Sequence, residues 1–450
     1  MSSPDVNDVA PERGPIEWLS GLQRFGMNPG LARVHALLAA IGTPQRTFEV
    51  VLVAGTNGKG STAKVLSACL IATGRRTGLF VSPHLQRLGE RATVDGAETS
   101  EAEMADAIAF VRPHAERLGA TYFEVVTAVC ALVFKRAGVK LAVMEVGLGG
   151  RLDATNALEP VLSIITGVAL DHMAVLGMDE AAIALEKAGV LRHGVTALTA
   201  ASGTALLVIE DEARRIGAPL RVVGADLHVR VVASSWAGLD LVVGGLADDL
   251  DMDLRVRTPL VGRHQAANVA IAAAGAVELG VPRAAVVTAV ERTTWPGRLE
   301  RLDHHGRHVV LDGAHNPQAA SALAAAMAEL APDCEVLILG TSADKDHERL
   351  LPPLLTVART IVVTKAALSP RASEPHQLAR LVHDAQAAAK RQGQEASAVV
   401  VAQDPAAAMQ RAIAVAPLGA TIVVAGSLFL VGEVRSLVLG EHGETGERWQ

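Results

Sequence analysis

The chain has few aromatic side chains, and this scarcity limits what its interior can be made of. Aromatic residues make up 3% of the 450 residues, whereas apolar residues of all kinds make up 50%. The core must therefore consist mainly of Ala, Val and Leu. A chain of this length exceeds one typical hydrophobic core, so we expect two or three domains.

Cysteine and long apolar runs are also scarce. The three cysteines, Cys69, Cys130 and Cys334, are far apart and each lies in an apolar run. This pattern indicates small buried hydrophobic residues rather than a disulfide or a metal site. No apolar run reaches the ~18–20 residues that span a bilayer, and residues 1–14 are polar, unlike a signal peptide. We therefore expect a soluble, cytoplasmic protein with no membrane partner.

The sequence lacks a basic block as well. The formal net charge is -7 and the pI about 6.1, which argues against a nucleic-acid partner. Lysine is rare among the cations, since eight lysines stand against 33 arginines. Lys59 and Lys187 lie in the motifs described below, and Lys345 lies in Ala343-Asp344-Lys345-Asp346, which follows a predicted strand of the last part of the chain. A compact ammonium or a reactive amine would be useful at such positions.

Short apolar runs alternate with helical segments between residues 48 and 195. Such alternation is typical of a parallel sheet covered by helices on both faces. The predicted strands are residues 49–54, 77–81, 141–146 and 161–166, and the predicted helices are residues 61–73, 101–118 and 123–137.

A different pattern follows further along the chain. Residues 227–232, 239–243 and 252–257 alternate apolar and polar side chains, as strands of a half-exposed antiparallel sheet do. An alanine-rich helix is predicted over residues 265–279.

A Pro-Gly pair at residues 296 and 297 separates this part from a second alternating series. Its predicted strands are residues 309–312, 336–339, 360–364, 399–402 and 421–425. The sequence therefore predicts an α/β protein with two domains. Residues 1–296 form a P-loop-type, doubly wound, mainly parallel sheet with a small antiparallel sheet. Residues 297–450 form a smaller Rossmann-like domain.

The clearest chemical signal is a glycine-rich turn between a predicted strand and a predicted helix. Such a turn places backbone N–H groups and a helix N-terminus around phosphate groups. Lys59 would neutralise the outer phosphates, and the hydroxyl of Ser61 or Thr62 would reach a magnesium ion. The residues of the turn are Gly55, Thr56, Asn57, Gly58, Lys59, Gly60, Ser61 and Thr62.

The spacing of this turn departs from the standard phosphate loop. Only two residues separate its first two glycines, and a third glycine follows the lysine. An ordinary tight turn is the alternative interpretation. A GTPase is disfavoured because the sequence contains no Asn-Lys-x-Asp tetrapeptide for reading guanine.

Polar side chains follow the other predicted strands of the first series. Ser82, Glu145 and His172 all come at or shortly after strand ends, where open parallel sheets bind their ligands. Together they supply a hydroxyl, a carboxylate and an imidazole, a set suited to Mg²⁺ or Mn²⁺ beside a phosphate loop. Singly, they can equally be a turn residue, a helix cap and a partly buried histidine.

Lys187 lies in a helical run that ends at a glycine. It can be a solvated lysine paired with a nearby Glu. If it instead lies in the ligand-binding crevice at the carboxyl ends of the predicted strands, burial would lower its pKa. A neutral amine can then take up CO₂ as a carbamate, which is an anionic oxygen ligand for a metal.

The second series offers its own polar residues. Asp312 and His315 end its first strand, and Pro317 is well placed for the first turn of a helix. Asp312 and His315 can also be plain turn and cap residues. Arg298 lies at the boundary between the domains, where closure would bring it onto phosphate.

Motifs that contain these residues run in a fixed order along nearly the whole chain. They are Phe25-Gly26-Met27, Ala54-Gly55-Thr56-Asn57-Gly58-Lys59-Gly60-Ser61, Ser82-Pro83-His84, Phe123-Glu124, Glu145-Val146-Gly147-Leu148-Gly149-Gly150-Arg151-Leu152-Asp153-Ala154-Thr155-Asn156, Leu170-Asp171-His172, Glu186-Lys187-Ala188-Gly189, Gly262-Arg263-His264-Gln265-Ala266-Ala267-Asn268, Trp295-Pro296-Gly297-Arg298 and Asp312-Gly313-Ala314-His315-Asn316-Pro317. In these motifs the chain resembles the folylpolyglutamate synthase and dihydrofolate synthase group of the Mur ligase superfamily. One departure is Leu52, where the family often has His, and we expect it to change packing only.

The resemblance implies an ATP-dependent amide ligase that joins L-glutamate to a folate, or to dihydropteroate, through an acyl phosphate. Its expected partners are these small molecules, and a monomer is expected. The cofactors it implies are ATP, Mg²⁺, a carbamylated lysine and a monovalent cation such as K⁺. Two rival functions are a peptidoglycan-precursor ligase of the same superfamily and a non-catalytic nucleotide-binding module.

The same resemblance implies roles for individual residues. The magnesium ligands would be Ser61, Ser82, Glu145, His172 and carbamylated Lys187. The ATP site would comprise Gly55 to Thr62 with Gln265, Asn268, Arg298 and Asp312. The catalytic residues would be Lys59, His172, Lys187, Arg298, Asp312 and His315. The residues of the substrate pocket would be Phe25, Met27, Phe123, Arg151 and Asp153.

Overall fold

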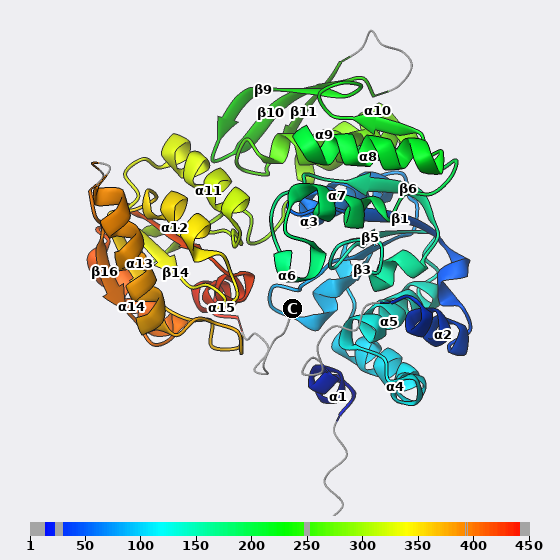
Figure 1. The fold of residues 1–450 in the computed structure, drawn as a ribbon, viewed down its shortest axis with the longest axis horizontal. Coiled ribbons are helices and arrows are strands. Elements are labelled where there is room, and N and C mark those ends of the chain that lie inside the picture. The colour runs from blue at the N-terminus through cyan, green and yellow to red at the C-terminus, as the bar shows by residue number, and fades with distance from the viewer. Residues whose placement is uncertain (1–13, 23–29, 247–252, 392, 394, 442–450) are drawn as a thin grey trace, which may run out of the picture.

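The computed structural model describes residues 14–22, 30–246, 253–391, 393 and 395–441 (Figure 1). Its largest sheet has eight strands in the order β4-β3-β2-β5-β1-β6-β7-β8. The pairings that link β2 to β8 are all parallel, and β3 and β4 add an antiparallel edge. The strands are β1 Glu49–Ala54, β2 Thr77–Phe80, β3 Ala92–Val94, β4 Ala97–Glu98, β5 Leu141–Glu145, β6 Pro160–Ile165, β7 Ala197–Thr199 and β8 Leu220–Val222.

Helices cover both faces of this sheet. They are α1 Pro15–Leu22, α2 Ala32–Ala40, α3 Lys59–Ile71, α4 Glu101–Leu118, α5 Tyr122–Arg136, α6 Met173–Leu176, α7 Glu180–Ala188, α8 Gly203–Ile216, α9 Gln265–Glu278 and α10 Arg283–Arg292. Ser100 and Thr121 cap α4 and α5, since each side chain accepts a hydrogen bond from the backbone N–H three residues on. The helix ends therefore follow directly from the local sequence.

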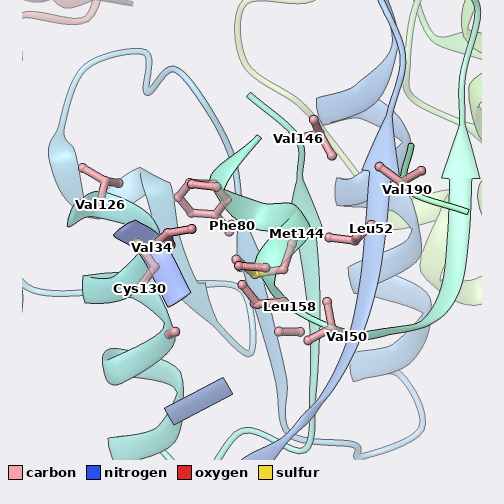
Figure 2. Packing of buried hydrophobic residues seen from close by; sticks show 14 of the residues in the cluster. Val34, Val50, Leu52, Phe80, Val126, Cys130, Met144, Val146, Leu158 and Val190 are labelled. Carbon is pink, nitrogen blue, oxygen red and sulfur yellow. The ribbon is translucent and has the colours of Figure 1, made fainter. Parts of the chain in front are cut away.

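The central strand β1 is buried on both sides, and its side chains alternate between two apolar clusters. Val50 and Leu52 belong to the cluster under α5, shown in Figure 2, whereas Val51 and Val53 belong to the cluster under α3 and α9. This alternation follows from the two-residue period of a strand. Leu52 is fully buried, so the departure from the family motif lies in the core.

A small antiparallel sheet packs beside α9. Its order is β11-β10-β9, and its apolar side chains join the same cluster as those of α9. The strands are β9 His228–Ser235, β10 Gly238–Gly244 and β11 Leu254–Thr258. The predicted antiparallel sheet is therefore confirmed, with residue 252 outside the described ranges.

The last third of the chain forms a second doubly wound sheet, coloured yellow to red in Figure 1. The order is β12-β13-β17-β14-β15-β16, with only the β12–β13 pair antiparallel. The strands are β12 Glu300–His304, β13 Arg307–Leu311, β14 Val336–Leu339, β15 Thr360–Val363, β16 Ala398–Val401 and β17 Thr421–Ala425. The helices are α11 Pro317–Leu330, α12 His347–Leu355, α13 Pro375–Lys390, α14 Pro405–Val415 and α15 Leu428–Leu439.

The fold class predicted from the sequence is confirmed, with several short elements added. Strands β3, β4, β7, β8 and β12 and helix α8 were not predicted individually. The predicted boundary at residues 296 and 297 falls between α10 and β12, and no described strand pairs across it. We call the elements α1 to α10 the N-terminal lobe and β12 to α15 the C-terminal lobe.

Two predictions from composition can also be compared with the structure. Cys69, Cys130 and Cys334 are buried free thiols, as expected. Among the described residues, no helix is both long enough and apolar enough to cross a bilayer.

Candidate functional site

The glycine-rich turn lies between β1 and α3, and hydrogen bonds fix it to the segment that follows β6. The Thr56 N–H donates to the Gly167 carbonyl at 2.8 Å, and the Thr56 hydroxyl donates to the Ala169 carbonyl at 3.1 Å. The Thr166 hydroxyl donates to the Asn57 carbonyl at 2.7 Å. Because both segments follow central parallel strands, the turn is held at the carboxyl edge of the sheet.

Two glycines of this turn have backbone angles and neighbours that exclude a side chain. Gly55 has φ +142° and Gly58 has φ +86°, both in the region that favours glycine. A Cβ on Gly55 would overlap Thr166 Oγ1, and one on Gly58 would overlap Asn268 Oδ1. Asn268 Nδ2 in turn donates to Oε1 of the buried Gln265 at 2.9 Å. The structure thus brings Gln265 and Asn268 next to the turn.

Lys59 begins α3 at the end of the glycine-rich turn. Its Nζ donates to the Thr56 carbonyl at 3.1 Å. Its positive charge acts to lower the pKa of the Glu145 carboxyl, of His172 and of Lys187. Three of the predicted residues therefore lie within electrostatic reach of Lys59.

Glu145 ends the central strand β5 and is 6% exposed. Burial raises the pKa of its carboxyl, while Lys59 and a hydrogen bond from the Ser82 N–H oppose that rise. The Ser82 N–H donates to Glu145 Oε2 at 3.0 Å, and Oε1 has no hydrogen-bond partner among the residues the structure describes. A buried carboxylate with a free oxygen is suited to a cation.

Lys187 comes from α7 and is 3% exposed. Its Nζ donates to the Gly55 carbonyl at 2.8 Å, so it lies directly behind the glycine-rich turn. Burial, with a further contribution from Lys59, lowers its pKa from 10.5 to about 7. A large fraction of this side chain is therefore a neutral amine at neutral pH.

The turn after β5 packs closely against α7 and fixes the position of Lys187. A Cβ on Gly150 would come within 2.8 Å of the Glu186 carbonyl oxygen, tighter than real side chains allow. The Arg151 N–H donates to the same carbonyl at 2.8 Å. The glycine-rich motif at residues 147–150 therefore supports the site through close backbone packing.

His172 caps the short helix α6 with φ +51° and lies beside Asp171. Burial lowers the pKa of His172 to about 4, and Lys345 and Lys59 add to that effect against Asp171. Burial alone would raise the pKa of Asp171, but His172 and Lys345 hold it well below its usual range. At neutral pH, His172 is therefore an uncharged ring and Asp171 an anion.

Asp171 is also where the two lobes meet. Lys345 Nζ lies 2.8 Å from Asp171 Oδ1, and both side chains are 11% exposed. Asn316 Nδ2 donates to Asp171 Oδ2 at 3.0 Å and to Asn57 Oδ1 at 2.9 Å. His315 Nε2 lies 3.8 Å from Asp171 Oδ2. We call Asn57, Asp171, His315, Asn316 and Lys345 the interlobe cluster.

Asp312 and Arg298 lie at the start of the C-terminal lobe. The carboxylate of Asp312 accepts from the N–H groups of Leu299 and Ala314, both at 2.9 Å. Arg298 contacts the Gly297 carbonyl and the backbone at Gly313, and its charge lowers the pKa of Glu145. Asp312 therefore stabilises the turn between the lobes through these hydrogen bonds, and Arg298 lies close enough to Glu145 to act on its charge.

The predicted substrate residues have more varied surroundings. Phe123 packs against Gly147, and its ring centroid lies 6.0 Å from that of Phe80. The Asp153 carboxylate accepts from the Leu148 and Thr155 N–H groups, at 2.9 and 3.0 Å. Asp153 thus stabilises the turn after β5.

Of the other three predicted substrate residues, Arg151 is the one that lies in the part of the chain the structure describes. Arg151 is exposed, and its guanidinium pairs with Glu186 Oε1 at 2.6 and 3.0 Å. Phe25 and Met27 lie outside the described residues.

Asp171, Asn316 and Lys345 were not among the predicted site residues. The rarity of lysine pointed weakly to Lys345, but nothing in the sequence paired it with Asp171. In the described ranges, no group of three or more His, Cys, Asp or Glu side chains is arranged to hold a metal. The predicted metal ligands contain only two residues of these types.

Comparisons with known proteins identify the family of the chain. Residues 53–276 match the Mur ligase middle domain, and residues 297–428 match the Mur ligase, glutamate ligase domain. A dihydrofolate synthase/folylpolyglutamate synthase of Bacillus subtilis is 32% identical over 93% of this chain and 97% of its own length. The chain belongs to the folylpolyglutamate synthase/dihydrofolate synthase family of Mur ligases. The resemblance stated from the motifs is therefore confirmed.

Two further family members extend the comparison. A probable bifunctional folylpolyglutamate synthase/dihydropteroate synthase of Haloferax volcanii is 37% identical over 94% of this chain. The chain spans about half (50%) of the length of that relative. The structure of E. coli FolC in complex with DHPP and ADP superposes with a TM-score of 0.84 at 30% identity, covering 95% of this chain and 98% of FolC.

Proposed function

We propose that the protein is an ATP-dependent ligase that adds L-glutamate to folates and also to dihydropteroate, through an acyl phosphate. The observation that carries this proposal is the meeting of a glycine-rich phosphate turn, a buried carboxylate and a buried lysine at the junction of two lobes. The Bacillus subtilis relative is named for both activities, and E. coli FolC was solved with DHPP and ADP.

The nucleotide fits at the edge of the glycine-rich turn. The residues proposed to bind ATP are Gly55, Thr56, Asn57, Gly58, Lys59, Gly60, Ser61, Thr62, Gln265, Asn268, Arg298 and Asp312. In this arrangement the N–H groups at the start of α3 face the phosphates. The closeness of Asn268 to Gly58 supports a single binding surface from the turn to α9.

The donor set suits Mg²⁺ and also permits Mn²⁺. Ser61, Ser82, Glu145, His172 and carbamylated Lys187 are the proposed ligands. The free oxygen of buried Glu145 and the uncharged ring of His172 fit this role. The metal would neutralise phosphate charge. A Lys187 pKa of about 7 supports carbamate formation, in which the neutral amine adds CO₂ and releases one proton.

The chain's own residues supply positioning and charge. The acceptor carboxylate attacks the terminal phosphorus of ATP, ADP leaves, and the amine of glutamate then displaces phosphate from the acyl phosphate. Lys59 and Arg298 stabilise the negative charge that builds up as two anions approach. Because the centre lies between two lobes, their contact keeps water from the acyl phosphate. No protein nucleophile is needed.

The residues proposed to bind the acceptor are Phe25, Met27, Phe123, Arg151 and Asp153. Of these, Phe123 has the clearest support, because its ring packs on Gly147, in the turn that follows β5. A monovalent cation such as K⁺ and a monomeric state remain predictions of the family resemblance.

The decisive experiment measures ADP release that depends on L-glutamate, with dihydropteroate and tetrahydrofolate as alternative acceptors. We expect turnover with both, and ¹⁸O from a labelled acceptor carboxylate should appear in inorganic phosphate. A nucleotide-sugar acceptor should give no turnover, which separates this function from that of a peptidoglycan-precursor ligase. ADP release without any need for glutamate would contradict the proposal.

A further inference from the structure

A cavity of about 600 Å³ lies between the lobes, and none of the interlobe cluster lines it. From the N-terminal lobe it is lined by α3, the segment between β2 and β3, and α10. From the C-terminal lobe it is lined by α15, whose place between the lobes is visible in Figure 1. Trp295, Pro296 and Arg298 of the interlobe connection form its inner end.

This cavity shares one residue, Arg298, with the proposed ATP site. Its lining contains none of the glycine-rich turn, and neither Gln265, Asn268 nor Asp312. It also contains neither Phe123 nor Asp153, so it is distinct from the proposed ring pocket. Apart from Arg298, the residues proposed to bind the nucleotide and the acceptor ring therefore lie outside it.

The cavity nevertheless adjoins the reaction centre. Pro83 and Arg298 line it, and Pro83 directly follows the proposed metal ligand Ser82. A Cβ on Gly60 would lie 3.3 Å from Trp295 Nε1 and 3.5 Å from Glu145 Oε2, so Gly60 separates the indole from that carboxylate. A molecule with one end at the metal site can reach the cavity directly.

The lining is cationic although the whole chain carries a net charge of -7. It has five cationic side chains, Lys64, Arg87, Arg292, Arg298 and Arg435, against three acidic ones, Glu90, Glu98 and Glu441. All three acidic side chains already have partners. Glu90 accepts from three backbone N–H groups, Glu98 pairs with Arg87, and Glu441 lies 3.6 Å from Arg435 and 3.8 Å from Arg87.

Two of the cations form no salt bridge among the described residues. Lys64 lies over the Trp295 ring at 5.7 Å from its centroid, and burial lowers its pKa while the charge of Glu98 opposes that fall. Arg292, at the end of α10, is exposed and has no ion pair within the described ranges. Between them the wall is aliphatic, formed by Ala68, Ile71, Val81, Leu85 and Leu428.

We propose that this interlobe cavity binds the oligo-γ-glutamyl tail of the acceptor. Each γ-linked residue carries one α-carboxylate and a short run of methylene groups. The carboxylates match Lys64 and Arg292, and the methylene groups match the aliphatic wall between them. The proposal rests on the function proposed above, since such tails are what a folate-extending ligase produces.

The tail needs its own subsite for a geometric reason. The reacting carboxylate is always the terminal one and must reach the same metal centre in every cycle. Each added residue therefore lengthens the chain between that carboxylate and the acceptor ring. A cavity that opens at Pro83 and Arg298 takes up this extra length while the terminal residue keeps its position.

The test compares acceptors of different length with the full chain. In Lys64→Gln/Arg292→Gln, we expect KM for tetrahydrofolate with four glutamates to rise about ten-fold, while kcat and KM for the monoglutamate stay within two-fold. The products of the double variant should also be shorter. Lys390→Gln and Arg214→Gln remove the same charges at exposed positions outside the cavity and should change neither acceptor.

A binding measurement separates this inference from the proposed function. Tri-γ-glutamate without a pteridine ring should bind the unmodified protein in calorimetry and bind the double variant about ten-fold more weakly. If the unmodified protein shows no glutamate-dependent ADP release, the proposed function fails while this binding result still stands. Equal effects on short and long acceptors, or unchanged tri-γ-glutamate binding, would overturn the inference.

Discussion

Lysine is rare in this chain, yet three individual lysines occupy central positions in the candidate site and in the contact between the lobes. Lys59 starts α3 and acts electrostatically on Glu145 and Lys187. Lys187 donates a hydrogen bond to the glycine-rich turn. Lys345 pairs with Asp171 across the lobes. A compact ammonium on a flexible stem can serve each of these positions.

Lys59→Met tests the role of the ammonium with little change in side-chain volume. We expect kcat for glutamate-dependent ADP release to fall about 100-fold or more, because charge stabilisation at the phosphates is lost. The circular dichroism spectrum should be unchanged. Lys140→Met, at an exposed position, serves as the control, and near-normal turnover of Lys59→Met would exclude the proposed phosphate contact.

Lys187→Ala tests the proposed carbamate. The variant should lose about 100-fold or more of kcat, and short carboxylates such as acetate should restore part of it by occupying the vacated space as an oxygen ligand. Formamide, which has a similar size and no charge, is the control. Equal rescue by both compounds would show that volume rather than a negative oxygen is what the site requires.

Lys187 should also make stability depend on pH. Its pKa falls from 10.5 to about 7 on folding, so between these values the unfolded chain holds a proton that the folded protein has released. The free energy of unfolding therefore rises with pH in this window.

Lys187→Met removes that contribution. As the pH rises from 7 to 9, the free energy of unfolding of the unmodified protein should therefore increase relative to that of the variant, by on the order of 1–3 kcal/mol. Urea unfolding with a chelator and without CO₂ measures this difference. A difference that does not change with pH would contradict a lowered Lys187 pKa.

At the scale of elements, the unit formed by β1, the glycine-rich turn and α3 positions the site. Gly58 has φ +86° and no room for a Cβ because of Asn268. Gly74, which follows α3, has φ +77° and nothing within 4 Å of an added Cβ. The two positions therefore share backbone strain and differ only in the steric contact.

Replacing each glycine with alanine separates these two effects. Gly74→Ala should lose about 1 kcal/mol of unfolding free energy through backbone strain alone. Gly58→Ala should lose about 2–4 kcal/mol, because overlap with Asn268 is added, and should also weaken ATP binding. Urea unfolding and nucleotide titration measure both. Equal losses of unfolding free energy in the two variants would mean that the Asn268 side chain moves aside at no cost.

The elements that the sequence predicted well are those that are buried on both sides. Strands β1, β5 and β6 read as apolar runs because helices cover both faces, and α4 and α5 have clear capping residues. The three-residue strands β7 and β8 gave no pattern, since a strand this short has no period to read. β7 depends on pairing with β6, and β8 on pairing with β7, and only the folded sheet supplies these neighbours.

The features of the site that the sequence could not predict depend on how the two lobes are arranged in the whole molecule. Residues after the central strands were correctly expected to gather at one edge, because parallel strands end together. The contact of Asp171 with Lys345 and Asn316 depends instead on how the C-terminal lobe lies against the N-terminal lobe. Nothing local in either segment specifies that placement.

This contact gives a prediction for the coupling of the two lobes. Asp171 and Lys345 are both nearly buried and separated by 2.8 Å, so removing one charge leaves the other unpaired in a low-dielectric region. Asp171→Asn or Lys345→Met alone should weaken lobe association by about 3–5 kcal/mol, whereas the double variant should be less affected than the sum of the two. Calorimetry should show one unfolding transition in the unmodified protein and a broadened or split one in each single variant.

The exposed pair Lys365–Glu374, which lies within the C-terminal lobe, provides the matched control. Lys365→Met should leave the transition unchanged, since exposed pairs contribute about 0–1 kcal/mol. Added salt should scarcely alter the effect of the buried pair, because ions screen it weakly. If the effects of Asp171→Asn and Lys345→Met simply add, the two side chains do not join the lobes as a pair, and other contacts between the lobes, such as that of Arg263 with Glu329, do so.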